Sequence, residues 1–225
     1  MSATDKGPGL LSQFLENFAK PLSNDIMLGL PDSLFVGSAF FSLFTQSQAY
    51  GFLTLAMVEF IAVYNILAKF SNFVSTGASD PIKCLPGYSS LFQLSILSCF
   101  TKQSSFPSGP VFFVGAVYAY ILASIISFSD EYNYLGEKNA DWKSRIPMSV
   151  IFGTIFLFGF IAWRFMNSCD NIVPMIGSLI LGIVIGTIVQ RVHYSGFGED
   201  SVNFLGVPLL LDRAADGKPM YICSK

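Results

Sequence analysis

Long apolar runs separated by short polar stretches dominate the chain. Five of these runs approach the roughly 20 residues with which a helix crosses the hydrocarbon core of a bilayer. They are Ile26 to Phe44, Ala49 to Phe70, Val111 to Phe128, Ile146 to Phe165 and Ile172 to Val192. The first run is weakened by Pro31 and Asp32 near its start. The pattern predicts an all-α protein whose helices form a polytopic membrane bundle.

A sixth run, Tyr88 to Thr101, has 14 residues and is interrupted by serines and Gln93. Lys and Arg accumulate on the cytoplasmic side of membrane proteins, so their distribution is a test of whether this run crosses. If it does and the N-terminus is inside, the inner segments hold 11 of the 13 basic residues. If it does not cross, the two sides hold six and seven. We therefore predict six transmembrane helices with both termini on the cytoplasmic side.

The chain divides into three parts on this interpretation. Residues 1–25 form an N-terminal segment in which apolar side chains from Leu10 to Phe18 recur at helical spacing. This spacing predicts a short amphipathic helix that lies on the membrane surface or packs against the body of the protein. Residues 26–192 form the bundle of six helices. Residues 193–225 form a C-terminal tail that lies against the bundle or a partner.

Composition excludes several functional classes. The 225 residues are 52% hydrophobic and 12% charged, against roughly a quarter charged in soluble domains, which argues against a soluble enzyme. A net charge of −2 provides no basic field for nucleic acid. The four cysteines are scattered singly and no histidine lies at metal-ligand spacing, so we expect no metal site and no cofactor. Cys99 and Cys169 are predicted near the outer face, where a disulfide or two free thiols are both open.

Small residues recur at every fourth position in two of the predicted helices. Such rows let helix backbones approach closely, because lipid provides no hydrophobic drive for helix association. The rows are hypothesised to face each other, although small residues are common in membrane helices in any case. They comprise Gly115, Ala119, Ala123 and Ser127 in the fourth predicted helix, and Ser178, Gly182 and Gly186 in the sixth.

The turn formed by Pro107, Ser108 and Gly109 stands immediately before the fourth predicted helix. The free backbone N–H groups and positive dipole end of a helix N-terminus attract anions, phosphate among them. A Pro-Ser-Gly sequence is also an ordinary start signal for a helix, so the turn alone leaves both interpretations open.

This turn resembles one motif of the type-2 phosphatidic acid phosphatase superfamily, whose members are six-span membrane enzymes that hydrolyse lipid phosphates. The family has Pro-Ser-Gly-His at the start of its fourth span, and Trp163-Arg164 stands where its Ser-Arg motif would begin. The resemblance covers roughly Tyr88 to Val192. It implies a headgroup-binding site made of Lys102, Ser108, Gly109 and Arg164. The alternative for Arg164 is a side chain that simply extends to the membrane interface.

The catalytic histidines of that family are missing. Pro110 occupies the position of the acid histidine, Asp170 that of the nucleophilic histidine and Pro174 that of the supporting aspartate. The single histidine, His193, is expected at the opposite, inner end of the sixth helix, where we interpret it as a residue at the membrane interface. Because phosphoryl transfer in this family needs both a nucleophile and an acid, we expect a protein that is not an enzyme.

Glu59 is an ionisable residue near the middle of the second predicted helix. Such residues are costly in the bilayer and usually face the bundle interior. Glu59 is therefore expected to be neutral and hydrogen-bonded inside the bundle, with Asn65 and Gln93 as the nearest polar candidates. The alternative is a site for proton or small-ion transport.

Three functional hypotheses result. The first is a non-catalytic structural or scaffolding component of a membrane assembly, which binds the bilayer and neighbouring proteins and has no nucleic-acid partner. The Phe-Pro-Ser-Gly-Pro string and the final Lys-Pro-Met-Tyr-Ile-Cys run are similar to membrane proteins of large DNA viruses with an internal lipid layer, which implies capsid proteins as partners. The others are a lipid phosphatase or headgroup-binding protein with an altered site, and a transporter that uses Glu59.

Overall fold

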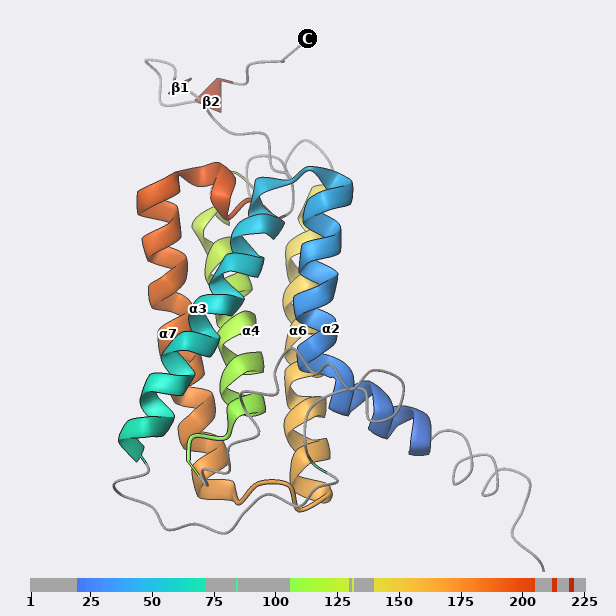
Figure 1. Cartoon of the computed structure of the whole chain (residues 1–225). Coiled ribbons are helices and arrows are strands. Elements are labelled where there is room, and N and C mark those ends of the chain that lie inside the picture. Colours follow the sequence, from blue (N-terminus) through green and yellow to red (C-terminus); the bar gives the residue numbers. More distant parts are fainter. Residues whose placement is uncertain are drawn as a thin grey trace, which may run out of the picture.

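The computed structural model describes residues 20–71, 84, 106–129, 131, 140–204, 212–213 and 219–220. Within this part of the chain, five long helices stand side by side in a bundle (Figure 1). They are α2 (Lys20–Thr45), α3 (Gln48–Ser71), α4 (Gly109–Ser127), α6 (Ala140–Met166) and α7 (Ile172–Phe197). A 3₁₀ turn, η4 (Glu199–Ser201), follows α7, and β1 (Asp212–Arg213) pairs antiparallel with β2 (Pro219–Met220).

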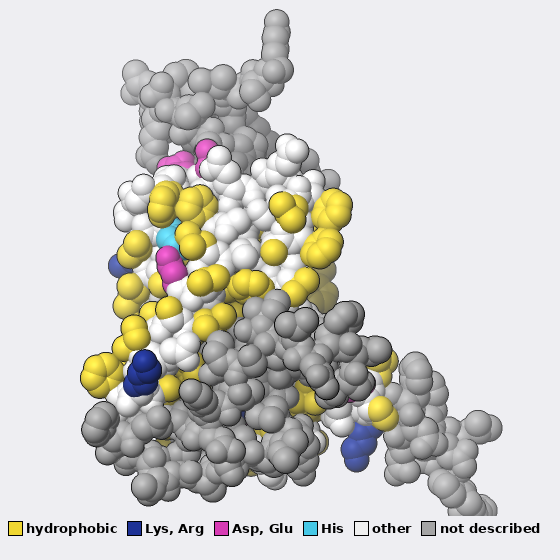
Figure 2. Space-filling view, in the orientation of Figure 1, with side chains coloured by type: hydrophobic (Ala, Val, Ile, Leu, Met, Phe, Trp, Pro, Cys, Tyr) yellow, Lys and Arg dark blue, Asp and Glu magenta, His cyan; other side chains and the backbone are white. Residues whose placement is uncertain are grey.

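All five helices are long and apolar enough to cross a membrane. Large hydrophobic side chains cover their outer surfaces, among them Phe44, Phe70, Phe158 and Val173, and yellow side chains dominate the described surface in Figure 2. Such an exterior is stable in lipid and unfavourable in water. The predicted all-α class is confirmed, and the five helices fit an integral membrane protein.

Ring contacts show that α3 runs antiparallel to both α4 and α7. The Tyr64 ring, near the end of α3, lies 6.0 Å from the Phe112 ring near the start of α4. The Phe52 ring, near the start of α3, lies 5.5 Å from the His193 ring near the end of α7. The end of the bundle where α2, α4 and α7 begin is called the Arg164 end below, and the opposite one the His193 end. Figure 1 shows the Arg164 end at the bottom.

This arrangement corrects the predicted topology. The end of α3 and the start of α4 both lie at the Arg164 end, whereas the six-helix prediction places them on opposite sides of the membrane. That run lies outside the described residues, and six helices are not confirmed. The start of α2 and the end of α7 lie at opposite ends of the bundle (Figure 1), so the structure does not support both termini on one side.

Helix α2 differs from the predicted N-terminal organisation. Residues 1–19 lie outside the described part, while α2 begins at Lys20 and runs through the predicted boundary at residue 26. Leu22 and Ile26 are exposed alongside polar neighbours, so this first described helix is not clearly amphipathic. Its start bends away from the bundle (Figure 1), as expected for a helix that contains Pro31, which cannot donate a backbone hydrogen bond.

Helix α4 is the centre of the bundle, with most of its side chains buried, whereas α6 packs at the periphery. Helix α4 runs parallel to α7, and α4 and α7 make the closest helix pair. The Ser108 backbone N–H donates to Ser178 Oγ over 2.7 Å. One and two turns further on, a Cβ at Gly182 or Gly186 would collide with the backbone oxygen of Phe112 or Ala116. The row of small residues on α7 is therefore where the two backbones approach.

The backbone of α4 approaches α7 most closely beside the hypothesised row, and members of that row also contact α7. Ser108, Phe112 and Ala116 of α4 meet the small residues of α7, whereas Gly115 lies against Leu179. Gly115 is thus at the edge of the contact. Ser127, at the other end of the small-residue row on α4, accepts a hydrogen bond from Gln190 Nε2 of α7 over 3.2 Å, so both ends of the row contact α7.

Candidate functional site

The predicted headgroup residues that the structure describes lie at the Arg164 end of the bundle. Ser108 is the N-cap residue of α4 and Gly109 is its first helical residue. Arg164 lies in the last turn of α6. Lys102 lies outside the described residues. The structure therefore brings Ser108, Gly109 and Arg164 to one end, on two different helices.

Ser108 is buried, with 4% of its surface exposed. Its side chain makes no capping hydrogen bond, and its Oγ has no hydrogen-bond partner. Its backbone N–H is already used, because it donates to Ser178 Oγ, which in turn donates to the Pro174 carbonyl. One of the N–H groups that a helix N-terminus offers to an anion is thus occupied by α7, while the Ser108 hydroxyl remains available.

Arg164 is even more deeply buried, at 2% exposed. Its Nε donates to the Asp170 carboxylate in an ion pair in which both side chains are almost fully buried. Its Cζ lies 5.9 Å from the centre of the Phe160 ring, and its Nη2 has no hydrogen-bond partner. The alternative interpretation, in which Arg164 extends to the membrane interface, is wrong because the side chain turns inward to Asp170.

The turn between α6 and α7 positions this ion pair. Ser168 adopts a left-handed backbone conformation with φ 55°. The Cys169 N–H then donates to the Arg164 carbonyl over 2.9 Å, and the Ser168 N–H to the Phe165 carbonyl over 3.0 Å. These two bonds form a Schellman motif, which satisfies the last carbonyls of a helix. The motif reverses the chain so that Asp170 lies beside the Arg164 side chain.

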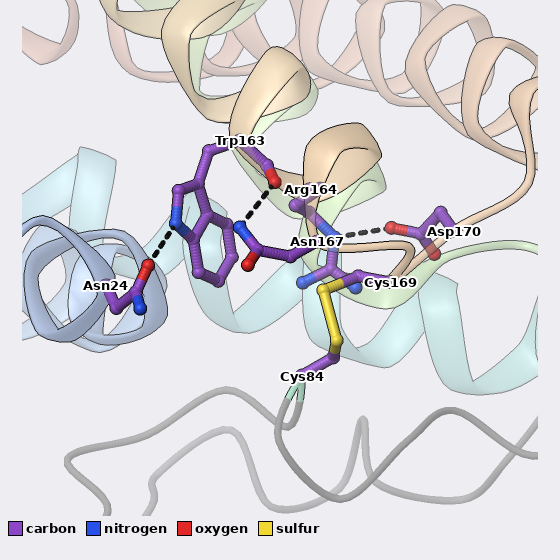
Figure 3. The surroundings of a disulfide bond; sticks show 7 residues. All are labelled: Asn24, Cys84, Trp163, Arg164, Asn167, Cys169 and Asp170. Carbon is purple, nitrogen blue, oxygen red and sulfur yellow. Dashed lines mark hydrogen bonds and ion pairs between the residues drawn. A yellow bond between two sulfur atoms is a disulfide. The ribbon is translucent and has the colours of Figure 1, made fainter. Parts of the chain in front are cut away.

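A disulfide between Cys84 and Cys169 closes the same corner. Figure 3 shows the Arg164 guanidinium between the Asp170 carboxylate and this disulfide. The sequence analysis considered Cys99 as the partner of Cys169, and the structure pairs Cys169 with Cys84 instead. Cys84 was not considered as the partner because the predicted sixth crossing puts Cys84 on the inner side. In the structure with five described helices, Cys84 lies at the Arg164 end.

Two further features complete the Arg164 end. The Trp163 indole N–H donates to Asn24 Oδ1 of α2 over 2.8 Å, which ties α6 to the start of the bundle (Figure 3). Asp170 lines a pocket of about 360 Å³ together with side chains of the turn and the start of α7. A carboxylate in the wall of this pocket repels phosphate, so the pocket does not extend the predicted headgroup site.

A second polar cluster lies near the His193 end, within the helices. The Tyr120 hydroxyl is 2.8 Å from His193 Nδ1, and His193 Nε2 is 3.4 Å from the Glu59 carboxylate. The side chains of Tyr120 and His193 are buried, and 42% of the Glu59 side chain is exposed. Sequence reasoning did not connect these residues, which are contributed by α3, α4 and α7. The signal that the sequence offered for this cluster was the presence of a polar residue in each of three apolar helices.

Glu59 departs from its expected surroundings. Its side chain is 42% exposed and therefore only partly enclosed by the bundle, and its described partner is the buried His193 rather than Asn65. Gln93 lies outside the described residues. His193 in turn is a buried member of this cluster and not an interface residue. It is also remote from Ser108, because its partner Tyr120 is 12 residues further along α4, or about 18 Å at 1.5 Å per residue.

Among the described residues, no three His, Cys, Asp or Glu side chains are grouped so that they could hold a metal ion. Comparisons with protein families, with curated proteins and with solved structures found no match for this chain. The functional conclusion therefore depends on the geometry of the two clusters.

Proposed function

We propose that this chain is a non-catalytic integral membrane protein that acts as a structural component of a membrane assembly. The observation that carries the proposal is the buried Arg164–Asp170 ion pair. It engages Arg164, which the resembled family would direct at the substrate phosphate, with Asp170, which stands at the position of that family's nucleophilic histidine. The viral internal-membrane proteins that the sequence resembles suggest one such assembly, a membrane under a capsid.

Three surrounding ties support the proposal. The Cys84–Cys169 disulfide, the Trp163–Asn24 hydrogen bond and the Ser108–Ser178 hydrogen bond all join segments far apart in the sequence at the Arg164 end. A site that must admit, turn over and release a lipid benefits from movable elements. A corner joined by covalent, ionic and hydrogen bonds is suited to holding a fixed shape.

Two measurements test this proposal. Purified protein in vesicles that contain phosphatidic acid is expected to release phosphate at the background rate, and turnover that disappears in Asp170→Asn would contradict the proposal. Extraction from the native membrane in a mild detergent is expected to yield a complex of fixed composition, larger than the 24.6 kDa chain. Recovery of the chain alone, without any fixed companion, would also count against it.

A second candidate function is the binding of a lipid phosphate headgroup without hydrolysis. Two buried polar atoms at the Arg164 end favour it, because neither Ser108 Oγ nor Arg164 Nη2 has a hydrogen-bond partner. Burying an unsatisfied polar atom costs about 1–3 kcal/mol, and a phosphate oxygen is an acceptor that would satisfy either group. The Asp170 charge opposes this binding by neutralising Arg164.

Lipid selectivity distinguishes the second candidate from the first. The protein is reconstituted with equal amounts of phosphatidic acid and phosphatidylcholine, and the lipids retained after purification are measured. Headgroup binding predicts an enrichment of phosphatidic acid that falls about fivefold in Ser108→Ala, the effect of one hydrogen bond. The matched control is Ser195→Ala, an exposed serine near the end of α7. Equal retention of both lipids by the unmodified protein would exclude the site.

A further inference from the structure

Tyr120, His193 and Glu59 form a chain of polar contacts in the second cluster. Tyr120 is 0% exposed, and its hydroxyl contacts His193 Nδ1. A buried hydroxyl needs a hydrogen-bond partner, and among the described residues His193 Nδ1 is the partner of the Tyr120 hydroxyl. The other ring nitrogen of His193, Nε2, lies 3.4 Å from the Glu59 carboxylate.

Within the described part of the chain, the Glu59 carboxylate is held only by long contacts to one residue, because both of its oxygens lie 3.4 Å from His193 Nε2. Its side chain is 42% exposed, so it is also accessible from outside the bundle. Lipid chains offer no hydrogen-bond donor, and an unpaired acid there is costly. A donor from another molecule would remove that cost.

The surface around Glu59 is apolar. Leu55, Ala62 and Ile66 are exposed on α3 one or two turns from Glu59, on the same side of the helix. Val192, the residue before His193, is exposed on the neighbouring helix α7. Figure 2 shows an acidic side chain next to the histidine, among hydrophobic side chains. Ala62 leaves space in which another helix can approach the α3 backbone closely.

We propose that this face of α3 and α7 is a docking surface for a transmembrane helix of another protein, which places a Lys or Arg side chain against Glu59. A basic side chain provides several N–H donors and the charge that balances the carboxylate. The inference rests on the proposed function in one respect, since it takes assembly with other membrane proteins as the role of the chain.

A second copy of the chain is a less complementary occupant. In a two-fold dimer centred on this face, Glu59 would oppose Glu59. Arg191 lies two residues from His193 on α7 and is therefore turned about 200° around the helix, away from the face.

A synthetic helix tests the proposal directly. The full-length protein carries a donor fluorophore in phosphatidylcholine vesicles, and a Leu- and Ala-rich transmembrane peptide carries the acceptor. One version of the peptide has a single Lys at the depth of Glu59, and the control version has Leu there. The Lys peptide is expected to associate roughly fivefold more strongly than the Leu peptide, as for other intramembrane polar contacts.

Variants assign the effect to Glu59. Glu59→Gln keeps the size of the side chain and is expected to reduce association of the Lys peptide to that of the Leu peptide. Glu199→Gln, at an exposed acid in η4, is the matched control and is expected to change nothing. Glu59→Lys is expected to reverse the preference in favour of a peptide that carries Glu, which provides a gain of binding that misfolding could not produce.

Three results would overturn the proposal. They are equal association of the Lys and Leu peptides, Lys-peptide association that survives Glu59→Gln, and energy transfer between two labelled copies of the chain that disappears in Glu59→Gln. The last result would assign the face to self-association. A native complex that persists alongside any of these results would leave the proposed structural role intact and remove this surface alone.

Discussion

Arg164 and Asp170, six residues apart at the junction of α6 and α7, form an ion pair in which 2% and 5% of the respective side chains are exposed. Removing one partner of a buried pair leaves an uncompensated charge, which is usually far more destabilising than removing both. This asymmetry makes the pair a sensitive probe of the Arg164 end.

Asp170→Asn is expected to destabilise the protein by about 3 kcal/mol or more, because the Arg164 charge stays buried without its partner. The double variant Arg164→Met with Asp170→Asn is expected to lose less than Asp170→Asn alone, since it removes the buried charge. Reversible unfolding in detergent measures both. Equal losses in the single and double variants would mean that the charge of Arg164 is balanced elsewhere.

Cys84→Ser is expected to lower stability by about 4 kcal/mol, because the disulfide constrains an unfolded loop that spans 85 residues. Reductant should produce the same loss in the unmodified protein and none in the variant. Cys223→Ser is the control, since Cys223 lies outside the pair. If electrophoresis without reductant shows the same mobility for Cys84→Ser and the unmodified protein, the pairing is wrong.

Gly182→Ala and Gly186→Ala are each expected to destabilise the bundle by about 2 kcal/mol or more, because the added methyl group meets the backbone of α4. In Gly37→Ala and Gly159→Ala, the added methyl group lies in open space. They are expected to be neutral or stabilising by up to about 1 kcal/mol, the helix preference of Ala over Gly. Thermal unfolding of the four variants tests the parallel α4–α7 contact, and equal effects at all four positions would argue against it.

Cysteine labelling tests the orientation of the helices. In a background with Cys99→Ser and Cys223→Ser, new cysteines at Lys69 and Ser168 are expected to react from the same side of the membrane. New cysteines at Gln46 and Gly196 should react from the other side, because α3 and α6 end where α2, α4 and α7 begin. A topology with six helices would separate the members of each pair.

The same labels assign the compartments. The Lys69 and Ser168 labels are expected on the side away from the cytosol, because disulfides such as Cys84–Cys169 persist in oxidising surroundings. Labelling of both from the cytosol would contradict this orientation, while the arrangement of the helices would remain as described.

The apolar runs alone were enough to locate the five helices. A helix that crosses lipid must satisfy its own backbone hydrogen bonds over a set length, and this requirement acts on each segment separately. The predicted runs and the observed helices therefore agree closely in the middle of each helix and differ at its ends. The placement of Ser108 at the start of α4 and of Arg164 near the end of α6 follows from the same local rule.

Tertiary structure decided which of these segments meet. The count of basic residues favoured a sixth crossing, which the described residues do not confirm, and that prediction placed Cys84 and Cys169 on opposite sides and both termini on the same side. The ion pair of Arg164 and the contact of His193 with Tyr120 and Glu59 depend on how helices distant in sequence rotate and approach. The packing of helices against one another decides which residues meet. Lipid does not drive this packing, and hydropathy does not record it, because hydropathy is summed along one segment at a time.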